Sequence, residues 1–264
     1  MNVVILTSSN KGSAPIHLIK LVESKKINVK SVIISQGKIK NRIKYYRRKI
    51  IKVFKIGLFG ALNGLRMRKW YIDDVENLMN LQSIENLCKK HHIPFNFTPT
   101  INCIQTEMYI KNTNADLGLS LGNDYISSKI YLIPKLGMVN IHHEELPAYQ
   151  NAQSIIWQLY NNSPNTGFTI HKVDKNIDTG DILFKDTIPI IFKKNLRETV
   201  YFTCAKLWEK SAEGLVILLE NFEFYSKKSF EQKNGSTYTT PSLKQYITII
   251  KNFKSLKRLY KLEN

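Results

Sequence analysis

Short apolar runs alternate with stretches of helical periodicity along the first part of the chain. Four of the runs predict buried strands, at residues 3–6, 29–34, 115–121 and 137–141. Apolar residues recur every three or four positions over 16–22 and 80–90, as in amphipathic helices. Strands that alternate with helices are typical of a doubly wound, mostly parallel sheet. We therefore predict an α/β, Rossmann-like fold whose site lies beyond the carboxyl ends of the strands.

The later segments extend this pattern. Pro94 lacks a backbone donor, so the run that contains it, residues 93–97, is expected at the edge of the sheet. A helical turn is predicted at 125–132. The remaining expected elements are two strands, a long helix and a basic amphipathic tail, at residues 167–173, 181–188, 199–219 and 243–262.

The length of 264 residues, 43% of them hydrophobic, suits one domain with a sizeable core and a small appendage. We divide the chain into a catalytic domain, residues 1–222, and a C-terminal extension, residues 223–264. Within the catalytic domain, residues from about 37 to 72 are predicted to form a basic helical insertion.

Several features favour a cytoplasmic protein. The first residues lack the basic stretch and cleavage site of a secretion signal, and no apolar run approaches the roughly 18 residues that span a bilayer. Three scattered cysteines are interpreted as reduced thiols: Cys88, Cys103 and Cys204. His91 and His92 follow two lysines, as at a solvated helix end, and have no partners at metal-ligand spacing. We therefore expect no metal site.

The net charge of +18 favours acidic partners such as phosphorylated metabolites, nucleic acid or an anionic membrane, although richness in Ile, Asn and Lys is also typical of an AT-rich genome. No acidic residue occurs between Glu23 and Asp73. Residues 38–56 combine an apolar stripe (Ile43, Tyr46, Ile50, Val53, Phe54) with a basic surround (Arg42, Lys44, Arg47, Arg48, Lys49, Lys52, Lys55). Three interpretations stay open: a packed helix with a solvated basic face, peripheral membrane contact, or nucleic-acid binding.

The densest candidate chemistry lies between residues 137 and 183. Asn140 and His142 share strand parity, so both side chains point to one side of the predicted strand. Asp178 lies in a small-residue turn before the next strand. An amide, an imidazole and a carboxylate that converge at strand ends suit attack on a carbonyl, because the amide and imidazole can stabilise an oxyanion and the carboxylate can orient the imidazole and relay a proton.

This ordered set resembles the folate-dependent formyltransferases. The shared pattern is Asn-x-His, then Leu-Pro, then Thr-Gly, then Asp-x-Gly, and the chain carries Asn140-Ile-His142, Leu146-Pro147, Thr166-Gly167 and Asp178-Thr-Gly180. The resemblance implies a Rossmann-like fold and 10-formyltetrahydrofolate as co-substrate, with a primary amine attacking the formyl carbon. It implies that Asn140 and His142 hold the oxyanion, and that Asp178 pairs with His142 and helps to remove the amine proton.

The resemblance also implies the walls of the site. The co-substrate would lie against two loops, at Leu121, Gly122, Asn123, Tyr125 and Ile126 and at Asp174, Ile177 and Gly180. The acceptor would lie near His143, Glu144, Pro147 and Tyr149. His143 points away from His142 on a strand and is interpreted mainly as structural. His171 falls in an alternating strand and is interpreted as a core or sheet-face residue.

The loop between the first strand and helix is a second acceptor candidate. Small residues there expose backbone N–H groups, which can bind phosphate. An ordinary strand-to-helix turn explains the same pattern, since neither a Walker loop nor a full dinucleotide fingerprint is present. The residues are Ser8, Ser9, Asn10, Lys11, Gly12 and Ser13.

Departures from the family pattern bear on the acceptor. Glu144 and Glu145 replace the usual residues after the histidine, and the tail after Phe230 is too short for a tRNA-binding barrel. We expect a nucleotide-linked amino sugar destined for a surface polysaccharide, no stable nucleic-acid partner, and leave a homodimer open. The alternatives are another amine, such as aminoacyl-tRNA or a ribonucleotide amine, or a non-catalytic relative that binds membrane or nucleic acid.

Overall fold

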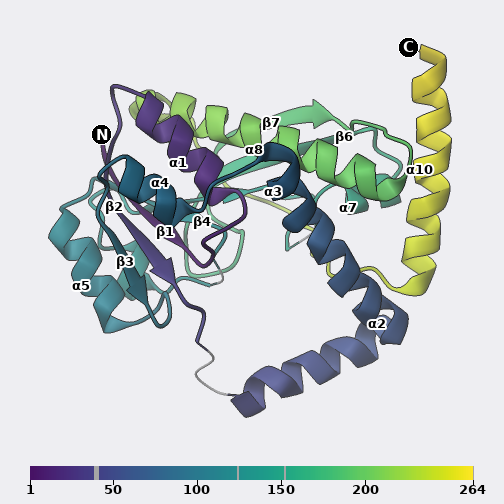
Figure 1. Ribbon diagram of the computed structural model, residues 1–264, viewed down its shortest axis with the longest axis horizontal. Coiled ribbons are helices and arrows are strands. Elements are labelled where there is room, and N and C mark those ends of the chain that lie inside the picture. Colours follow the sequence, from purple (N-terminus) through teal and green to yellow (C-terminus); the bar gives the residue numbers. More distant parts are fainter. Residues whose placement is uncertain (39–41, 124, 152, 264) are drawn as a thin grey trace.

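The computed structural model describes residues 1–38, 42–123, 125–151 and 153–263, without the side chains of Lys44 and residues 261–263 (Figure 1). Residues 39–41 and the Lys44 side chain of the predicted basic helix therefore lie outside the described residues. The same holds for Asp124 in the predicted co-substrate loop and for Asn264 at the end of the C-terminal extension.

Seven strands form one sheet in the order β3-β2-β1-β4-β5-β6-β7. The first five in this order are parallel, and β6 and β7 continue the sheet antiparallel. This arrangement confirms the predicted doubly wound, mostly parallel fold, with the proline-led strand β3 at one edge. The strands are β1 (Asn2–Thr7), β2 (Asn28–Ser35), β3 (Phe95–Thr98), β4 (Leu117–Leu121), β5 (Met138–His142), β6 (Asn165–Lys172) and β7 (Ile182–Pro189).

Helices cover both faces of the sheet because its central strands are apolar on both sides. Val3 and Ile5 of β1 belong to a core with α1, α4 and α8, whereas Val4 and Leu6 pack with α5 and α6 on the other face. The helices, with bounds, are α1 (Ala14–Glu23), α3 (Asp73–Met79), α4 (Ile84–Lys90), α5 (Ile104–Thr113), α6 (Ser128–Tyr131), α7 (Ile156–Tyr160), α8 (Leu196–Glu220) and α9 (Phe222–Lys227).

The predicted helix over 80–90 begins later than expected. Asn80 adopts a left-handed conformation (φ 49°) that ends α3. The side chain of Ser83 then accepts a hydrogen bond from the Asn86 backbone and starts α4 at Ile84. The left-handed cap of α3 and the serine N-cap of α4 thus leave residues 80–83 outside the helix, and the preceding helix α3 was not predicted.

Two further helices extend from one side of the body (Figure 1). Helix α2 (Arg42–Tyr71) bends at Gly57, where φ is 75° and ψ is 166°. Its second half packs on the body through a buried stripe that includes Met67 and Trp70. Helix α10 (Leu243–Glu263) packs through Ile249 and Phe253 into the same core. Among the described residues, no helix is both long enough and apolar enough to cross a membrane.

Candidate active site

Asn140 and His142 lie at the carboxyl end of β5. Both side chains are partly exposed, whereas the intervening Ile141 is buried in the core. Strand alternation therefore presents the amide and the imidazole on one side of the sheet. Across β5, the antiparallel register with β6 pairs Asn140 with His171 and His142 with Thr169.

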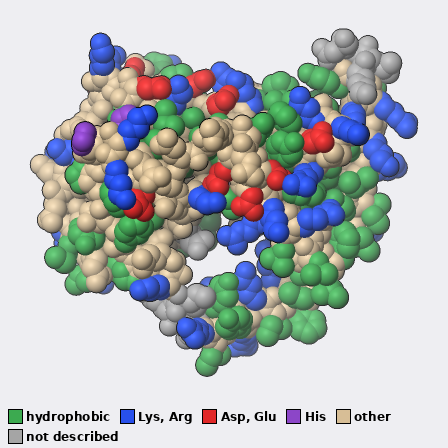
Figure 2. Space-filling model, in the orientation of Figure 1, with side chains coloured by type: hydrophobic (Ala, Val, Ile, Leu, Met, Phe, Trp, Pro, Cys, Tyr) green, Lys and Arg blue, Asp and Glu red, His purple; other side chains and the backbone are tan. Residues whose placement is uncertain are grey.

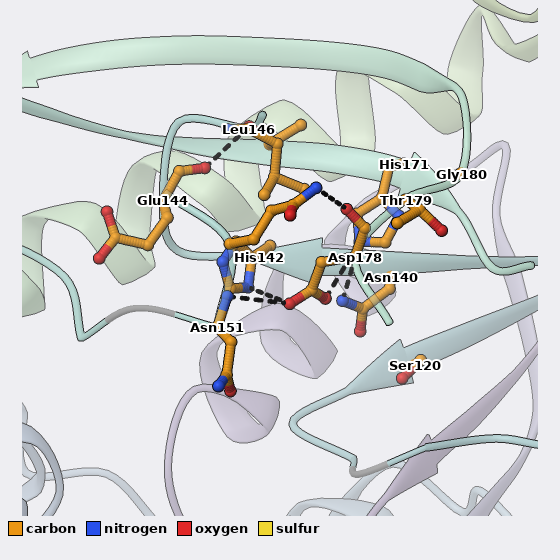
Figure 3. A network of polar contacts seen from close by, with 12 residues as sticks. Ser120, Asn140, His142, Glu144, Leu146, Asn151, His171, Asp178, Thr179 and Gly180 are labelled. Carbon is orange, nitrogen blue, oxygen red and sulfur yellow. Dashed lines mark hydrogen bonds and ion pairs between the residues drawn. The ribbon is translucent and has the colours of Figure 1, made fainter. Parts of the chain in front are cut away.

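Asp178 lies in the turn between β6 and β7, in a left-handed backbone conformation (φ 56°). Its Oδ2 atom accepts a hydrogen bond from the Asn151 backbone N–H at 3.3 Å and lies 3.9 Å from His142 Nδ1. Its Oδ1 atom lies 3.8 Å from His171 Nε2. Figure 3 shows the carboxylate between the two imidazoles and Asn151. One carboxylate thus neighbours both histidine rings.

His171 is a buried residue of β6, as the alternating pattern predicted, and it also contacts the site. The residue is 3% exposed, and its Nδ1–H donates to the Lys172 carbonyl at 2.9 Å. The second nitrogen, Nε2, accepts from Asn140 Nδ2 at 3.1 Å (Figure 3). Burial lowers the pKa of His171, partly offset by the charge of Asp178. A neutral ring can accept at Nε2, so His171 holds the amide of Asn140 in one orientation.

The ring of His142 is held from its other side. Its Nε2–H donates to the main-chain carbonyl of Tyr149 at 3.1 Å, which leaves Nδ1 facing Asp178. When the ring is protonated, Nδ1–H also points at the carboxylate. Tyr149 therefore serves the site through its backbone, while its aromatic ring stacks on Tyr238.

The three motif residues border a cavity of about 780 Å³ beyond the strand ends. Residues predicted for the co-substrate and the acceptor line it together: Ser13, Gly122, Asn123, Tyr125, Ile126, His143, Glu144, Asp174 and Ile177. A second cavity of about 770 Å³, bordered by α1, α4 and α8, is lined by none of the four residues Asn140, His142, His171 and Asp178. The first cavity is therefore the candidate active site.

Gly180 does not reach the cavity, although the resemblance implied co-substrate contact. It is buried against β6, where an added Cβ would lie 1.9 Å from the Lys172 carbonyl oxygen. The glycine of the Asp-x-Gly motif is thus required by backbone packing beside Asp178. Leu121 is likewise buried within β4 and contributes to the core. Pro147 follows a cis peptide bond, and its carbonyl accepts from the Ser236 backbone.

The strand-to-helix loop reaches the cavity only through Ser13. The backbone N–H of Gly12 donates to Glu76 at 2.6 Å, and the Lys11 ammonium lies 3.3 Å from the same carboxylate. Ser9 and Asn10 do not line the cavity, and the Asn10 side chain accepts a hydrogen bond from the Glu85 backbone N–H. The Ser8 hydroxyl donates to Asn123 at 2.9 Å. The carboxylate of Glu76 thus binds the loop groups that were predicted to bind a substrate phosphate.

Two acceptor candidates next to His142 are largely buried. His143 bonds to the Ser211 hydroxyl at 3.1 Å, and burial lowers its pKa well below the usual value. Glu144 is 1% exposed, accepts from the Gln158 amide, and has its pKa raised well above the usual value by burial. Oε1 of this carboxyl has no partner in the described structure. Both residues therefore form the floor of the cavity.

The sequence interpretation missed part of the cavity wall. Arg48, Arg68 and Tyr71 reach it from α2, and Trp208 reaches it from α8. Within the described residues, no carboxylate lies at ion-pair distance from either arginine. The basic character of 38–56 was a signal for Arg48, but its place at the cavity depends on the direction that α2 takes before its bend at Gly57.

With this geometry in view, the chain was compared with known proteins. Residues 109–212 match the family model described as formyl transferase, and this range contains Asn140, His142, His171 and Asp178. That segment is similar to the formyl transferase family. Methionyl-tRNA formyltransferase of Buchnera aphidicola subsp. Baizongia pistaciae is 33% identical over 168 residues, 63% of this chain and 50% of that protein.

A second relative modifies a sugar. GDP-perosamine N-formyltransferase of Brucella melitensis is 34% identical over 87 residues, 32% of this chain and 34% of that protein. The chain spans half or less of the length of the first curated relatives it matches. The fold is similar to that of an N-formyltransferase from Helicobacter canadensis, solved with folinic acid and dTDP-3-aminofucose. That structure has a TM-score of 0.50 and 16% identity, over 92% of this chain and 71% of the other.

Proposed function

We propose that this chain transfers a formyl group from 10-formyltetrahydrofolate to a primary amine. The observation that carries the proposal is the cluster of Asn140, His142 and Asp178 on one cavity, within the segment that matches the family. In the proposed reaction the amine nitrogen attacks the formyl carbon, and a tetrahedral oxyanion forms. The C–N bond to the folate then breaks, the amine loses a proton, and the folate nitrogen gains one.

Each residue has a proposed role in that reaction. One hydrogen of the Asn140 amide is given to His171, so the other is free to donate to the oxyanion. His142, in its protonated form, adds positive charge beside the oxyanion while its two N–H groups point at Tyr149 and Asp178. Asp178 stabilises that charge and accepts the proton of the amine, directly or through a water molecule.

The two loops at the cavity would hold the folate. Gly122, Asn123, Tyr125 and Ile126 of one loop and Asp174, Asn176 and Ile177 of the other line the cavity. Asn123 is fixed in place because its amide donates to the Leu6 carbonyl at 2.7 Å and to Ser120 at 3.2 Å. Held in this way, Asn123 can offer its backbone groups in a defined position to a pterin ring.

For the acceptor we propose a nucleotide-linked amino sugar. Arg48 and Arg68 line the cavity, and a pair of arginines suits the phosphates of a sugar nucleotide. One curated relative acts on GDP-perosamine, and one structural neighbour was solved with dTDP-3-aminofucose. The match to methionyl-tRNA formyltransferase covers more of this chain, so charged initiator tRNA is the second acceptor to test.

The proposal is tested by an acceptor panel. Purified protein is incubated with 10-formyltetrahydrofolate and one acceptor at a time. The acceptors are amino-sugar nucleotides of several bases, glycinamide ribonucleotide and charged initiator tRNA. The mass of each acceptor is measured by mass spectrometry before and after incubation. We expect one or more sugar nucleotides to gain the mass of one CO unit. Transfer only to tRNA would replace the proposed acceptor, and transfer to none of the amines would overturn the proposed reaction.

A further inference from the structure

The first half of helix α2 packs against little of the body. Every described side chain from Arg42 to Lys55 is exposed. Its aromatic contacts are local, between Tyr45 and Tyr46 and between Lys49 and Tyr45. An isolated helix of about this length is marginally stable in water, so a partner that binds this segment would stabilise the helical form.

The exposed surface of this segment is amphipathic. Ile43, Tyr46, Ile50 and Phe54 recur at three- and four-residue spacing and form one stripe. Ile43 is 83% exposed and Phe54 86% exposed. The apolar surface continues beyond Gly57 with Leu58, Leu62 and Leu65, all of which are exposed. Contiguous apolar surface of this kind marks an interaction site.

Cations border the stripe, and anions do not. The sequence from Ser24 to Ile72 holds no Asp or Glu, while Arg42, Arg47 and Lys49 lie on the flanks of the stripe. In Figure 2 the limb at the bottom, where α2 lies in Figure 1, carries hydrophobic and basic side chains together. The partner must therefore offer an apolar phase and negative charge side by side.

We propose that this outer face of α2 docks on a lipid bilayer that contains anionic headgroups. A bilayer interface accepts apolar side chains below the headgroups and attracts Lys and Arg at their level. A second copy of the chain would bring one cationic face against another, which electrostatic repulsion opposes. Nucleic acid would neutralise the cations but leave Ile43, Ile50 and Phe54 in water.

Docking through this face is compatible with an open active site. Arg48 is two positions from both Tyr46 and Ile50, so it points to the other side of the helix. On that side it lines the cavity that contains Asn140 and His142. The bilayer would thus hold the enzyme by one face of α2 while the cavity stays on the other. This inference does not depend on which amine is formylated.

The test is vesicle flotation of the full chain, with phosphatidylcholine alone and with phosphatidylcholine mixed with phosphatidylglycerol. We expect flotation with the mixed vesicles, strong weakening at high salt, and little binding to phosphatidylcholine. Ile50→Ser with Phe54→Ser should weaken binding by at least about 10-fold. Arg42→Gln, Arg47→Gln and Lys49→Gln together should weaken it by roughly 100-fold. Activity on a soluble acceptor should be unchanged in both variants.

The matched control lies on α5, at the far side of the body in Figure 1. Ile104 and Met108 are 68% and 57% exposed at helical spacing, and Ile104→Ser with Met108→Ser should leave vesicle binding unchanged. Circular dichroism checks that all variants fold. Failure to float with anionic vesicles, or equal binding by the Ile50/Phe54 variant, overturns the proposal. A dimer lost only in that variant, or RNA retention without flotation, overturns it in favour of those partners.

Discussion

At the residue scale, the site depends on which hydrogen-bonding groups are already used. The amide of Asn140 gives one hydrogen to His171, and the Nε2–H of His142 goes to the Tyr149 carbonyl. These bonds leave the second amide hydrogen and the Nδ1 side of His142 directed at the space near Asp178. Catalytic groups that are held before the substrate arrives need little reorganisation in the transition state.

Replacing His142 tests its charge. His142→Asn should lower kcat by about 100-fold or more, because a neutral amide cannot supply the positive charge beside the oxyanion. The fold should persist, since the ring is not part of the core. Steady-state kinetics and thermal melting measure both effects, with His91→Asn, an exposed histidine at a helix end, as the matched control. Turnover near that of the parent would contradict the role of His142.

His171 is expected to act as a positioning residue. His171→Phe removes the acceptor for Asn140 and should lower kcat by roughly 10-fold, with KM for the folate nearly unchanged. His171→Gln offers a carbonyl oxygen in a similar place and should recover part of the loss. If the phenylalanine variant raises KM and leaves kcat alone, the ring shapes the folate pocket instead of holding Asn140.

At the scale of elements, the buried His17 of α1 and His143, which follows β5, meet at Ser211 of α8. Burial lowers the pKa of His17 to about 4, and His17 and His143 both bond to Ser211. The unfolded chain binds a proton at His17 from pH 6.5 downward, whereas the folded chain resists it until about pH 4. Stability is therefore full above pH 6.5 and is lost as the pH falls through this window.

The expected loss at His17 is about 3 kcal/mol in the free energy of unfolding. Urea unfolding at a series of pH values measures it. His17→Gln should make the dependence shallower, because one of the buried titrating rings is removed, whereas His91→Gln at the surface should leave it unchanged. A free energy of unfolding that stays constant across this window would show that burial does not lower the pKa of His17.

The turn that carries Asp178 is held by close backbone packing. Gly180→Ala should reduce the free energy of unfolding by about 4 kcal/mol, because the new Cβ meets the Lys172 carbonyl. Gly37→Ala is the matched control: φ there is 63°, and nothing lies within 4 Å of the added atom, so the cost should be only about 1 to 2 kcal/mol. Similar costs at both positions would contradict the packing argument.

At the scale of the whole molecule, the sequence predicted what periodicity and local motifs encode. Strand parity placed Asn140 and His142 on one side of β5, and alternation of apolar runs predicted the sheet. The role of His171 depended on the antiparallel register of β5 and β6, which a single strand pattern does not contain. Arg68 reaches the cavity from the half of α2 that packs on the body, whereas Arg48 reaches it from the half before the bend at Gly57, and no local pattern contains that arrangement.

The arginines of α2 provide a prediction at this scale. Arg48→Gln with Arg68→Gln should raise KM for a sugar nucleotide by about 10- to 100-fold while KM for the folate stays the same, because only the acceptor carries the phosphates. Lys69→Gln, which changes an exposed charge on the same helix outside the cavity lining, is the matched control. If KM for the sugar nucleotide is the same in the arginine variant and in the Lys69 control, the two arginines do not bind its phosphates.

The most direct measurement follows the formyl carbon itself. 10-Formyltetrahydrofolate labelled with ¹³C in the formyl group is mixed with the protein and an amino-sugar nucleotide, and the label is observed by NMR. We predict that the signal moves from the folate to a formamide on the sugar with the parent chain, and stays on the folate with Asp178→Asn. A label that remains on the folate, or appears only as free formate, would contradict formyl transfer to an amine.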